Sequence, residues 1–223
     1  MKDKKQKKSG SLRQRKLSFP ADEKRHPWLP LLLNSYAIVD KGIDEAIKEG
    51  LRKGRKIACG KGCAHCCKTH QTIPVYPLEL VGLSWYVTEK VIGPERDTIK
   101  NQLRQYQEND PCPFLVRGAC SVHPVRPVAC RQFNVFDTPC GEGEDPYYTR
   151  RGDVLIPVRK YTDRAFFLML PFYGITGEEE RWKIIESGAV HQVVKLMQTC
   201  NWKSLADKME AFEKLDTENN SYK

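Results

Sequence analysis

Apolar residues recur at helical spacing through much of the chain. The clearest case lies between residues 29 and 51, where they follow one another at steps of three and four and so share one face of a helix. This apolar face comprises Leu32, Tyr36, Val39, Ile43, Ala46 and Ile47. The pattern predicts an amphipathic helix, and Gly54 is expected to lie beyond its end.

The same reasoning predicts several further helices. One begins at Pro77, which the first turn of a helix tolerates, and a more polar one covers residues 94–109. Helices are also expected towards the C-terminus, over residues 165–175, 178–198 and 202–215. A short extended piece, IPVY, precedes Pro77.

A different composition separates these helical patterns. Residues 111–146 hold six prolines, a density that excludes long helices and regular sheet ladders. An irregular stretch of this length inside a compact domain needs something to hold it, for which a metal centre is a common reason. We therefore expect a mainly α fold: a helical domain with two cysteine- and proline-rich metal-binding loops and little sheet.

The charge of the chain is unevenly distributed. Residues 1–25 contain ten Lys or Arg and three acidic residues, so they carry seven of the nine net positive charges. We expect a disordered basic tail over residues 1–25, a single cysteine-cluster domain over 26–215 with its metal-binding core at 59–140, and a flexible end over 216–223. The tail is expected to be a solubilising leader, with RNA as a possible partner.

Nine cysteines give the strongest chemical signal. No apolar run has the length of a membrane span, and none follows the basic start as a signal peptide would, so a cytoplasmic location is expected. Thiols stay reduced there, which favours metal binding or catalysis over a disulfide scaffold.

Eight of these cysteines fall into two segments, and we take all eight as candidate metal ligands. The first segment holds Cys59, Cys63, Cys66 and Cys67, and the second holds Cys112, Cys120, Cys130 and Cys140. Two four-sulfur centres would use all eight thiols, and one centre with several non-ligand thiols is equally compatible. Adjacent residues of an extended loop point in opposite directions, so Cys66 and Cys67 are not expected to face one ion together.

The spacing of the cysteines indicates that a metal is bound but identifies the metal less clearly. Thiolates suit zinc, Cu(I) and iron–sulfur clusters, and the irregular spacing favours an iron–sulfur cluster, of the 4Fe-4S type, over zinc. The spacing of Cys59, Cys63 and Cys66 is also that of radical SAM enzymes, but no glycine-rich strand follows here, and a proline-rich loop does.

Both loops together carry a family resemblance. The first cysteine segment, followed by CPFLVRGACSVHPVRPVACRQF, resembles the YkgJ-like cysteine-cluster family, whose members are described as zinc- or iron-chelating. The similarity covers residues 59–133 most clearly and extends weakly over 26–210, which leaves Cys140 outside the common core. It implies metal binding. Some members are iron–sulfur oxidoreductases, and a related pattern occurs in flagellin lysine-N-methylases.

Other residues are expected to surround the centre. Arg126, Arg131 and Phe133 are expected to lie directly behind the metal ligands. The two arginines would offset the negative charge of a thiolate cluster. The alternative for the arginines is a buried ion pair with an acid such as Asp137. His65 and His123 could each replace a thiolate, although a surface position is favoured for both. Cys200 stands alone and is expected to be a small buried side chain. DPYYTRR, residues 145–151, is either a contact surface for an anionic partner or a buried turn.

These observations favour a cysteine-ligated, iron–sulfur protein acting in electron transfer or redox sensing with an unidentified redox or protein partner. One alternative is a zinc-stabilised binding module without redox chemistry. Another is a metal-dependent modifying enzyme, for which the sequence indicates no catalytic residue and no substrate.

Overall fold

The structure is a computed structural model that describes residues 16–220. Helices dominate it, and the strands within the described residues form two small antiparallel pairs, β1 with β4 and β2 with β3. The mainly α fold with little sheet is thus confirmed. Among the described residues, no helix combines the length and the hydropathy that crossing a bilayer requires.

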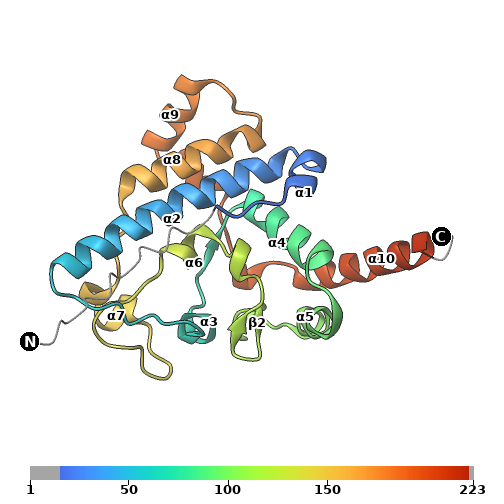
Figure 1. The fold of residues 1–223 in the computed structure, drawn as a ribbon, viewed down its shortest axis with the longest axis horizontal. Coiled ribbons are helices and arrows are strands. Elements are labelled where there is room, and N and C mark those ends of the chain that lie inside the picture. The colour runs from blue at the N-terminus through green and yellow to red at the C-terminus, as the bar shows by residue number, and fades with distance from the viewer. Residues whose placement is uncertain (1–15, 221–223) are drawn as a thin grey trace, which may run out of the picture.

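The longest helix, α2 (Trp28–Arg52), forms the spine of the molecule. It follows the short helix α1 (Pro20–Arg25) and packs lengthwise against α8 (Arg159–Met169), as Figure 1 shows. Its predicted apolar face is largely buried, and Gly54 lies beyond its end with a φ of +80°. The prediction for this helix is confirmed.

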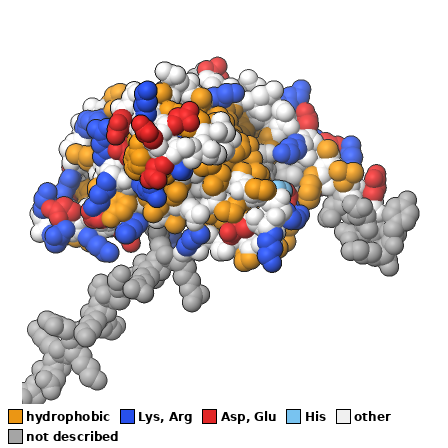
Figure 2. All heavy atoms as spheres, turned by 90° about the horizontal axis from the view of Figure 1, so that it is seen from above, with side chains coloured by type: hydrophobic (Ala, Val, Ile, Leu, Met, Phe, Trp, Pro, Cys, Tyr) orange, Lys and Arg blue, Asp and Glu red, His pale blue; other side chains and the backbone are white. Residues whose placement is uncertain are grey.

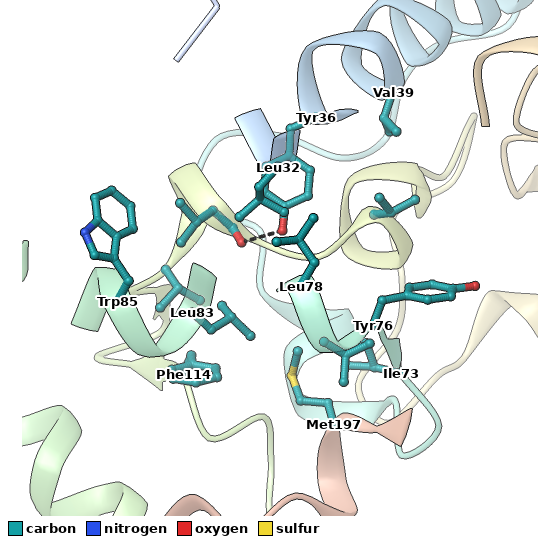
Figure 3. Close-up of a cluster of buried hydrophobic side chains, with 14 of the residues drawn as sticks. Leu32, Tyr36, Val39, Ile73, Tyr76, Leu78, Leu83, Trp85, Phe114 and Met197 are labelled. Carbon is teal, nitrogen blue, oxygen red and sulfur yellow. Dashed lines mark hydrogen bonds between the residues drawn. The ribbon is translucent and has the colours of Figure 1, made fainter. Parts of the chain in front are cut away.

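A second layer of helices packs beneath α2. It begins with α4 (Pro77–Glu89), which has its proline in the first turn as predicted, and continues with α5 (Gly93–Gln105). The C-terminal helix α10 (Trp202–Asn220) packs along α5 and extends away from the body in Figure 1. Leu32 and Tyr36 of α2 meet Leu78 and Leu83 of α4 in the core between these layers (Figure 3).

The cysteine-rich segments lie at the opposite side of α2 from α8 and α9 (Glu178–Glu186). They contain the short helices α3 (His65–Thr69), α6 (Val128–Gln132) and α7 (Pro146–Thr149), together with the hairpin of β2 (Leu115–Val116) and β3 (Ala119–Cys120). In the hairpin, Leu115 pairs with Cys120. Figure 1 shows α3 between this hairpin and the loop that precedes α7.

The helix expected over residues 178–198 is wrong beyond its first half. Helix α9 ends at Glu186, and Gly188 follows with a φ of +73°, a left-handed conformation that breaks the helix. Strand β4 (Lys195–Leu196) then pairs with β1 (Pro74–Val75), the extended IPVY piece. The sequence provided no sign of this pairing, because the two strands are two residues long and more than a hundred residues apart.

Helices α1 and α10 extend into the segments that the sequence analysis assigned to the two tails. Residues 1–15 of the basic tail lie outside the described residues, but Pro20–Arg25 form α1, and the Phe19 ring contacts that of Trp85 with centroids 5.0 Å apart. The packed domain therefore begins before residue 25. At the other end, α10 continues to Asn220, past the expected boundary at 215.

The described surface carries mixed charge. Residues 16–220 contain 29 Lys or Arg and 27 Asp or Glu. Figure 2 shows side chains of both signs distributed around a largely hydrophobic centre on one face, with no continuous basic area there. The folded part is thus nearly neutral, as the charge distribution of the sequence predicts.

Candidate metal centre

The first cysteine segment turns sharply into a short helix. The amide of Cys63 donates to the carbonyl of Gly60 at 3.1 Å, and Gly62 has a φ of +83°, a conformation that glycine adopts without strain. Helix α3 follows and carries Cys66 and Cys67. Successive residues of an α-helix are about 100° apart around its axis, so these two thiols are not opposed. The expectation that they point in opposite directions is wrong, because the segment is helical and not extended.

A backbone hydrogen bond joins the two cysteine segments. The amide of Cys112 donates to the carbonyl of Cys67 at 2.7 Å. Three further cysteines follow Cys112 along the chain. Cys120 lies in β3, Cys130 in α6 and Cys140 in the loop before α7. The remote segments therefore converge, as the predicted metal site requires.

Five thiols lie near one another where the two cysteine segments meet, and we call them the inner thiols. They are Cys66, Cys67, Cys112, Cys120 and Cys130. A hydrogen bond with Cys112 is the main influence on Cys67 and, with the loss of hydration, raises the pKa of that thiol to about 12. Burial, followed by the proximity of Cys66, Cys67 and Cys120, holds the pKa of Cys130 well above its usual range. Burial and neighbouring thiols thus raise the pKa of four inner thiols, namely Cys66, Cys67, Cys120 and Cys130.

The remaining three candidate ligands line a cavity, and we call them the outer thiols. Cys59, Cys63 and Cys140 face a cavity of about 310 Å³, whose wall also includes Lys61 and His65. Burial and then Cys59 raise the pKa of Cys140, with a smaller contribution from Cys63. The Cys59 sulfur accepts a hydrogen bond from the amide of Val135 at 3.2 Å. Cys63 is exposed, so this set is open to solvent.

The donor set fits a thiophilic metal. Eight free thiols in two neighbouring sets supply sulfur ligands of the kind that zinc and iron–sulfur clusters take. A bound cation stabilises thiolates and would therefore offset the burial that disfavours ionisation of thiols such as Cys130. Within the described residues, Asp22, His26 and Glu89 are the one group of three or more potential ligands whose donor atoms all lie within 4.8 Å of one another. Three cysteine sulfurs therefore do not approach one another that closely.

The acidic group at α1 is an ion-pair cluster. Asp22 is buried and pairs with Lys90 at 2.6 Å and with Arg25, which also binds Glu89 at 3.0 Å. These cations already neutralise the two carboxylates. The cluster ties α1 to the end of α4.

Arg131 is buried in an ion pair, as the alternative interpretation stated, but with a different acid. Its guanidinium donates to both carboxylate oxygens of Asp40 in α2, at 2.9 and 2.8 Å, and to the carbonyls of Arg126 and Pro124. Asp137, the acid suggested from the sequence, instead pairs with Arg55 at 2.8 Å. The sequence gives no means of choosing Asp40, which lies 91 residues away.

The other expected neighbours take separate positions. Arg126 lies against His123, with its Nη1 3.0 Å from the ring Nδ1. Burial raises the pKa of the Cys120 thiol, and the nearby guanidinium groups of Arg126 and Arg131 act in the opposite direction. This is the effect expected of positive charge beside a thiolate cluster. The Phe133 ring packs edge-on against His70, with centroids 4.2 Å apart.

Cys200 belongs to neither thiol set, whereas Arg150 of the DPYYTRR segment lies close enough to Cys59 and Cys140 to oppose the rise in the pKa of each thiol. Cys200 is half-buried, and its sulfur lies 3.3 Å from the carbonyl of Leu196. In the segment, Tyr148 is exposed, whereas Arg150 pairs with Glu144 at 2.8 Å and with Asp153 at 2.9 Å. The segment therefore combines an exposed aromatic side with an internally paired arginine, and neither of the two expected alternatives describes it fully.

Glu79 is a site residue that the sequence analysis missed. Its carboxylate is fully buried and accepts hydrogen bonds from the amide of Val128, at the start of α6, and from that of Tyr76. Burial raises its pKa to about 7. Glu79 thereby fixes the start of the helix that carries Cys130 and Arg131. The sequence signal that could have indicated this role is the position of Glu79, an acidic residue among the apolar residues of the helix predicted to begin at Pro77.

The segment after α9 supports the site from outside the cysteine-rich region. The Gln198 side chain accepts from the amide of Ile73 and donates to the carbonyl of His70, just after α3. The Cys112 sulfur lies 3.9 Å from that of Met197, and the Trp202 indole donates to the Met197 carbonyl at 2.8 Å. The Trp202 ring also packs edge-on against that of Phe114, with centroids 4.9 Å apart.

Comparison with known proteins agrees with this site. Residues 58–151 match the model of the family CxxCxxCC, described as "Putative zinc- or iron-chelating domain". No curated protein and no solved structure matches the chain. The matched region contains all eight candidate ligand cysteines, so the comparison supports metal binding by the segment in which they converge. Residues 58–151 therefore match the model of a zinc- or iron-chelating cysteine-cluster family, in agreement with the resemblance seen in the sequence.

Proposed function

We propose that the chain is an iron–sulfur protein that acts in electron transfer or redox sensing. The observation that carries this proposal is the convergence of eight thiols in two neighbouring sets, more than a single metal ion can bind. When bound, an iron–sulfur cluster supplies one-electron chemistry.

The spacing of the inner thiols supports a cluster over a single zinc ion at that set. Four thiolates around one zinc ion, each about 2.3 Å from it, lie about 3.8 Å from one another. In the described part of the chain, no three cysteine sulfurs lie within 4.8 Å of one another. Ligands of a multi-iron cluster bind different iron atoms, and the width of the inorganic core therefore separates them.

Polar groups around the thiols support a redox role. The amide of Val135 donates to the Cys59 sulfur, and the guanidinium groups of Arg126 and Arg131 favour the ionised form of Cys120. Hydrogen bonds and positive charge at the sulfurs stabilise the more negative, reduced state of a cluster and raise its potential.

Purification under anaerobic conditions tests the proposal. We expect coloured protein with a broad visible absorption that bleaches on reduction, and with stoichiometric iron and acid-labile sulfide. Colourless protein with stoichiometric zinc and no sulfide would refute it and would select the zinc-stabilised binding module. The redox partner is expected to be a protein that docks near the solvent-open outer thiols.

Binding of RNA to the basic tail is a separate proposal that depends on residues 1–25. Seven of the nine net positive charges lie there, so deletion of these residues should abolish salt-dependent RNA binding. An unchanged affinity would exclude the tail as the contact.

A further inference from the structure

The outer thiols lie to one side of the inner set. Cys112 and Cys120 are in or beside the β2–β3 hairpin, and Cys140 is in the loop before α7, with α3 between the two (Figure 1). Cys59 and Cys63, which are both outer thiols, line the same cavity as Cys140, whereas none of the inner thiols lines it.

The number of donors gives a second, independent argument. The inner set has five thiols, which exceeds the four that one tetrahedral ion or one cubane cluster takes. A centre among the inner thiols therefore needs none of the three outer ones. The outer thiols nevertheless gather around a common cavity, which loop packing alone does not require.

The cavity also offers a fourth ligand. His65, the first residue of α3, lines the same cavity as the three outer thiols. Three cysteines and one histidine are an established ligand set for tetrahedral metal ions, in which a neutral imidazole nitrogen binds beside three thiolates. No three of these four donor atoms lie within 4.8 Å of one another, so binding of one ion requires them to move closer together. The cavity of about 310 Å³ and the exposure of Cys63 leave room for this movement.

On this basis we propose that Cys59, Cys63, Cys140 and His65 form a second metal centre, separate from the centre held by the inner thiols. This inference rests on the proposed role of the cysteines as metal ligands, but not on the metal being iron. The outer centre takes a thiophilic cation and faces solvent, whereas the inner centre lies within the fold. The chain would then bind two metal centres with different accessibility.

Titration of the reduced, metal-free full-length chain with Co²⁺ under anaerobic conditions tests this proposal. Absorption from thiolate-to-cobalt charge transfer reports the number of bound sulfurs, and the ligand-field bands report the geometry. We expect two Co²⁺ per wild-type chain. The variant Cys59→Ser/Cys63→Ser/Cys140→Ser should bind one, with the spectrum of the inner centre retained. The matched control Cys200→Ser, which alters a cysteine outside both sets, should bind two.

The variant His65→Ala tests the fourth ligand. It should lower the affinity for one of the two Co²⁺ ions at least tenfold and shift its ligand-field bands, while the other ion is unaffected. Two Co²⁺ in the triple variant, one Co²⁺ in the wild type, or an unchanged His65→Ala spectrum would each overturn the proposal.

Two measurements keep the test independent of misfolding and of metal identity. The single variant Cys140→Ser changes a loop outside any helix, so it disturbs the fold less than the triple variant, and it should also lose the outer ion. Circular dichroism of each variant shows whether it is folded. Analysis of native iron and sulfide is separate, so colourless zinc protein that still binds two Co²⁺ would refute the iron–sulfur function and retain the two-centre inference.

Discussion

The guanidinium of Arg131 holds the Asp40 carboxylate with two hydrogen bonds, at 2.9 and 2.8 Å, and lies 4.0 Å from the centre of the Tyr36 ring. This contact joins α6, which carries Cys130, to the long helix α2. Asp40 and Tyr36 lie outside residues 58–151, the region that matches the family. The helical part of the chain thus fixes the position of a predicted ligand.

We expect Arg131→Lys to lower the free energy of unfolding by about 1–3 kcal/mol. An ammonium group cannot reproduce the planar fork that binds the carboxylate and two backbone carbonyls at once, so buried acceptors lose their donors. Urea denaturation measures the change. The control is Arg159→Lys, where the side chain is 81 % exposed and pairs with Asp163, and where the loss should stay below about 0.5 kcal/mol. Equal losses in the two variants would contradict the role assigned to Arg131.

Glu79 should make stability dependent on pH. Its pKa rises from 4.5 in the unfolded chain to about 7 in the folded protein, so the folded state retains a proton that the unfolded state releases. The stability that this group contributes is complete below about pH 4.5 and is lost as the pH rises to about 7. The difference in unfolding free energy between wild type and Glu79→Gln should therefore decrease by about 3 kcal/mol across this range.

Glutamine is a suitable comparison because it has nearly the same shape and does not titrate. It supplies one acceptor oxygen where Glu79 receives two amide hydrogen bonds, so the variant should be less stable than wild type by about 1–3 kcal/mol at acid pH. Denaturant titrations at several pH values, at equal metal content, provide the measurement. A difference that stays constant with pH would show that Glu79 does not titrate in this range.

The sequence predicted the elements better than their contacts. Helical periodicity identified α2, because this helix buries one continuous apolar face against the core, whereas α4 is buried on most sides and was predicted from Pro77 and the apolar residues that follow it. The periodicity failed over residues 187–198, where the apolar residues Val190 and Met197 belong to two separate 3-10 helices on either side of β4 and not to one α-helix. The local pattern cannot distinguish these cases, since the pairing of β4 with β1 depends on residues more than a hundred positions away.

Gln198 should stabilise the site from this segment. We expect Gln198→Ala to cost about 2 kcal/mol, because the Ile73 amide and the His70 carbonyl each lose a partner. Metal affinity should also fall, since both backbone groups lie just beyond α3. Gln192→Ala, at an exposed position in the same region, is the matched control and should change neither quantity. Wild-type affinity and stability in Gln198→Ala would show that the C-terminal segment does not support the site.

Candidate ligands could be proposed from the sequence, and their grouping could not. Thiolate chemistry suggested all eight cysteines without coordinates, and the family resemblance covered all of them except Cys140. Their division into inner and outer thiols depends on the path of the chain around α3, where a helix replaces the expected extended loop. Asp40 and Glu79 were missed because nothing in their local sequence indicates which distant group they bind.

Removal of the metal should destabilise the whole domain. The cysteine segments have little regular structure of their own, so metal binding contributes directly to folding. Chelation should lower the melting temperature by more than about 10 °C, and Cys130→Ser should do the same. Cys200→Ser should melt as wild type. A chelated protein with an unchanged melting temperature would show that folding and metal binding are not coupled.

X-ray absorption at the edge of the bound metal tests the central claim most directly. The account predicts a first coordination shell dominated by sulfur at about 2.3 Å, with this signal lost when cysteines of both sets are replaced by serine. A first shell of oxygen and nitrogen alone, or the same sulfur shell after these replacements, would contradict it.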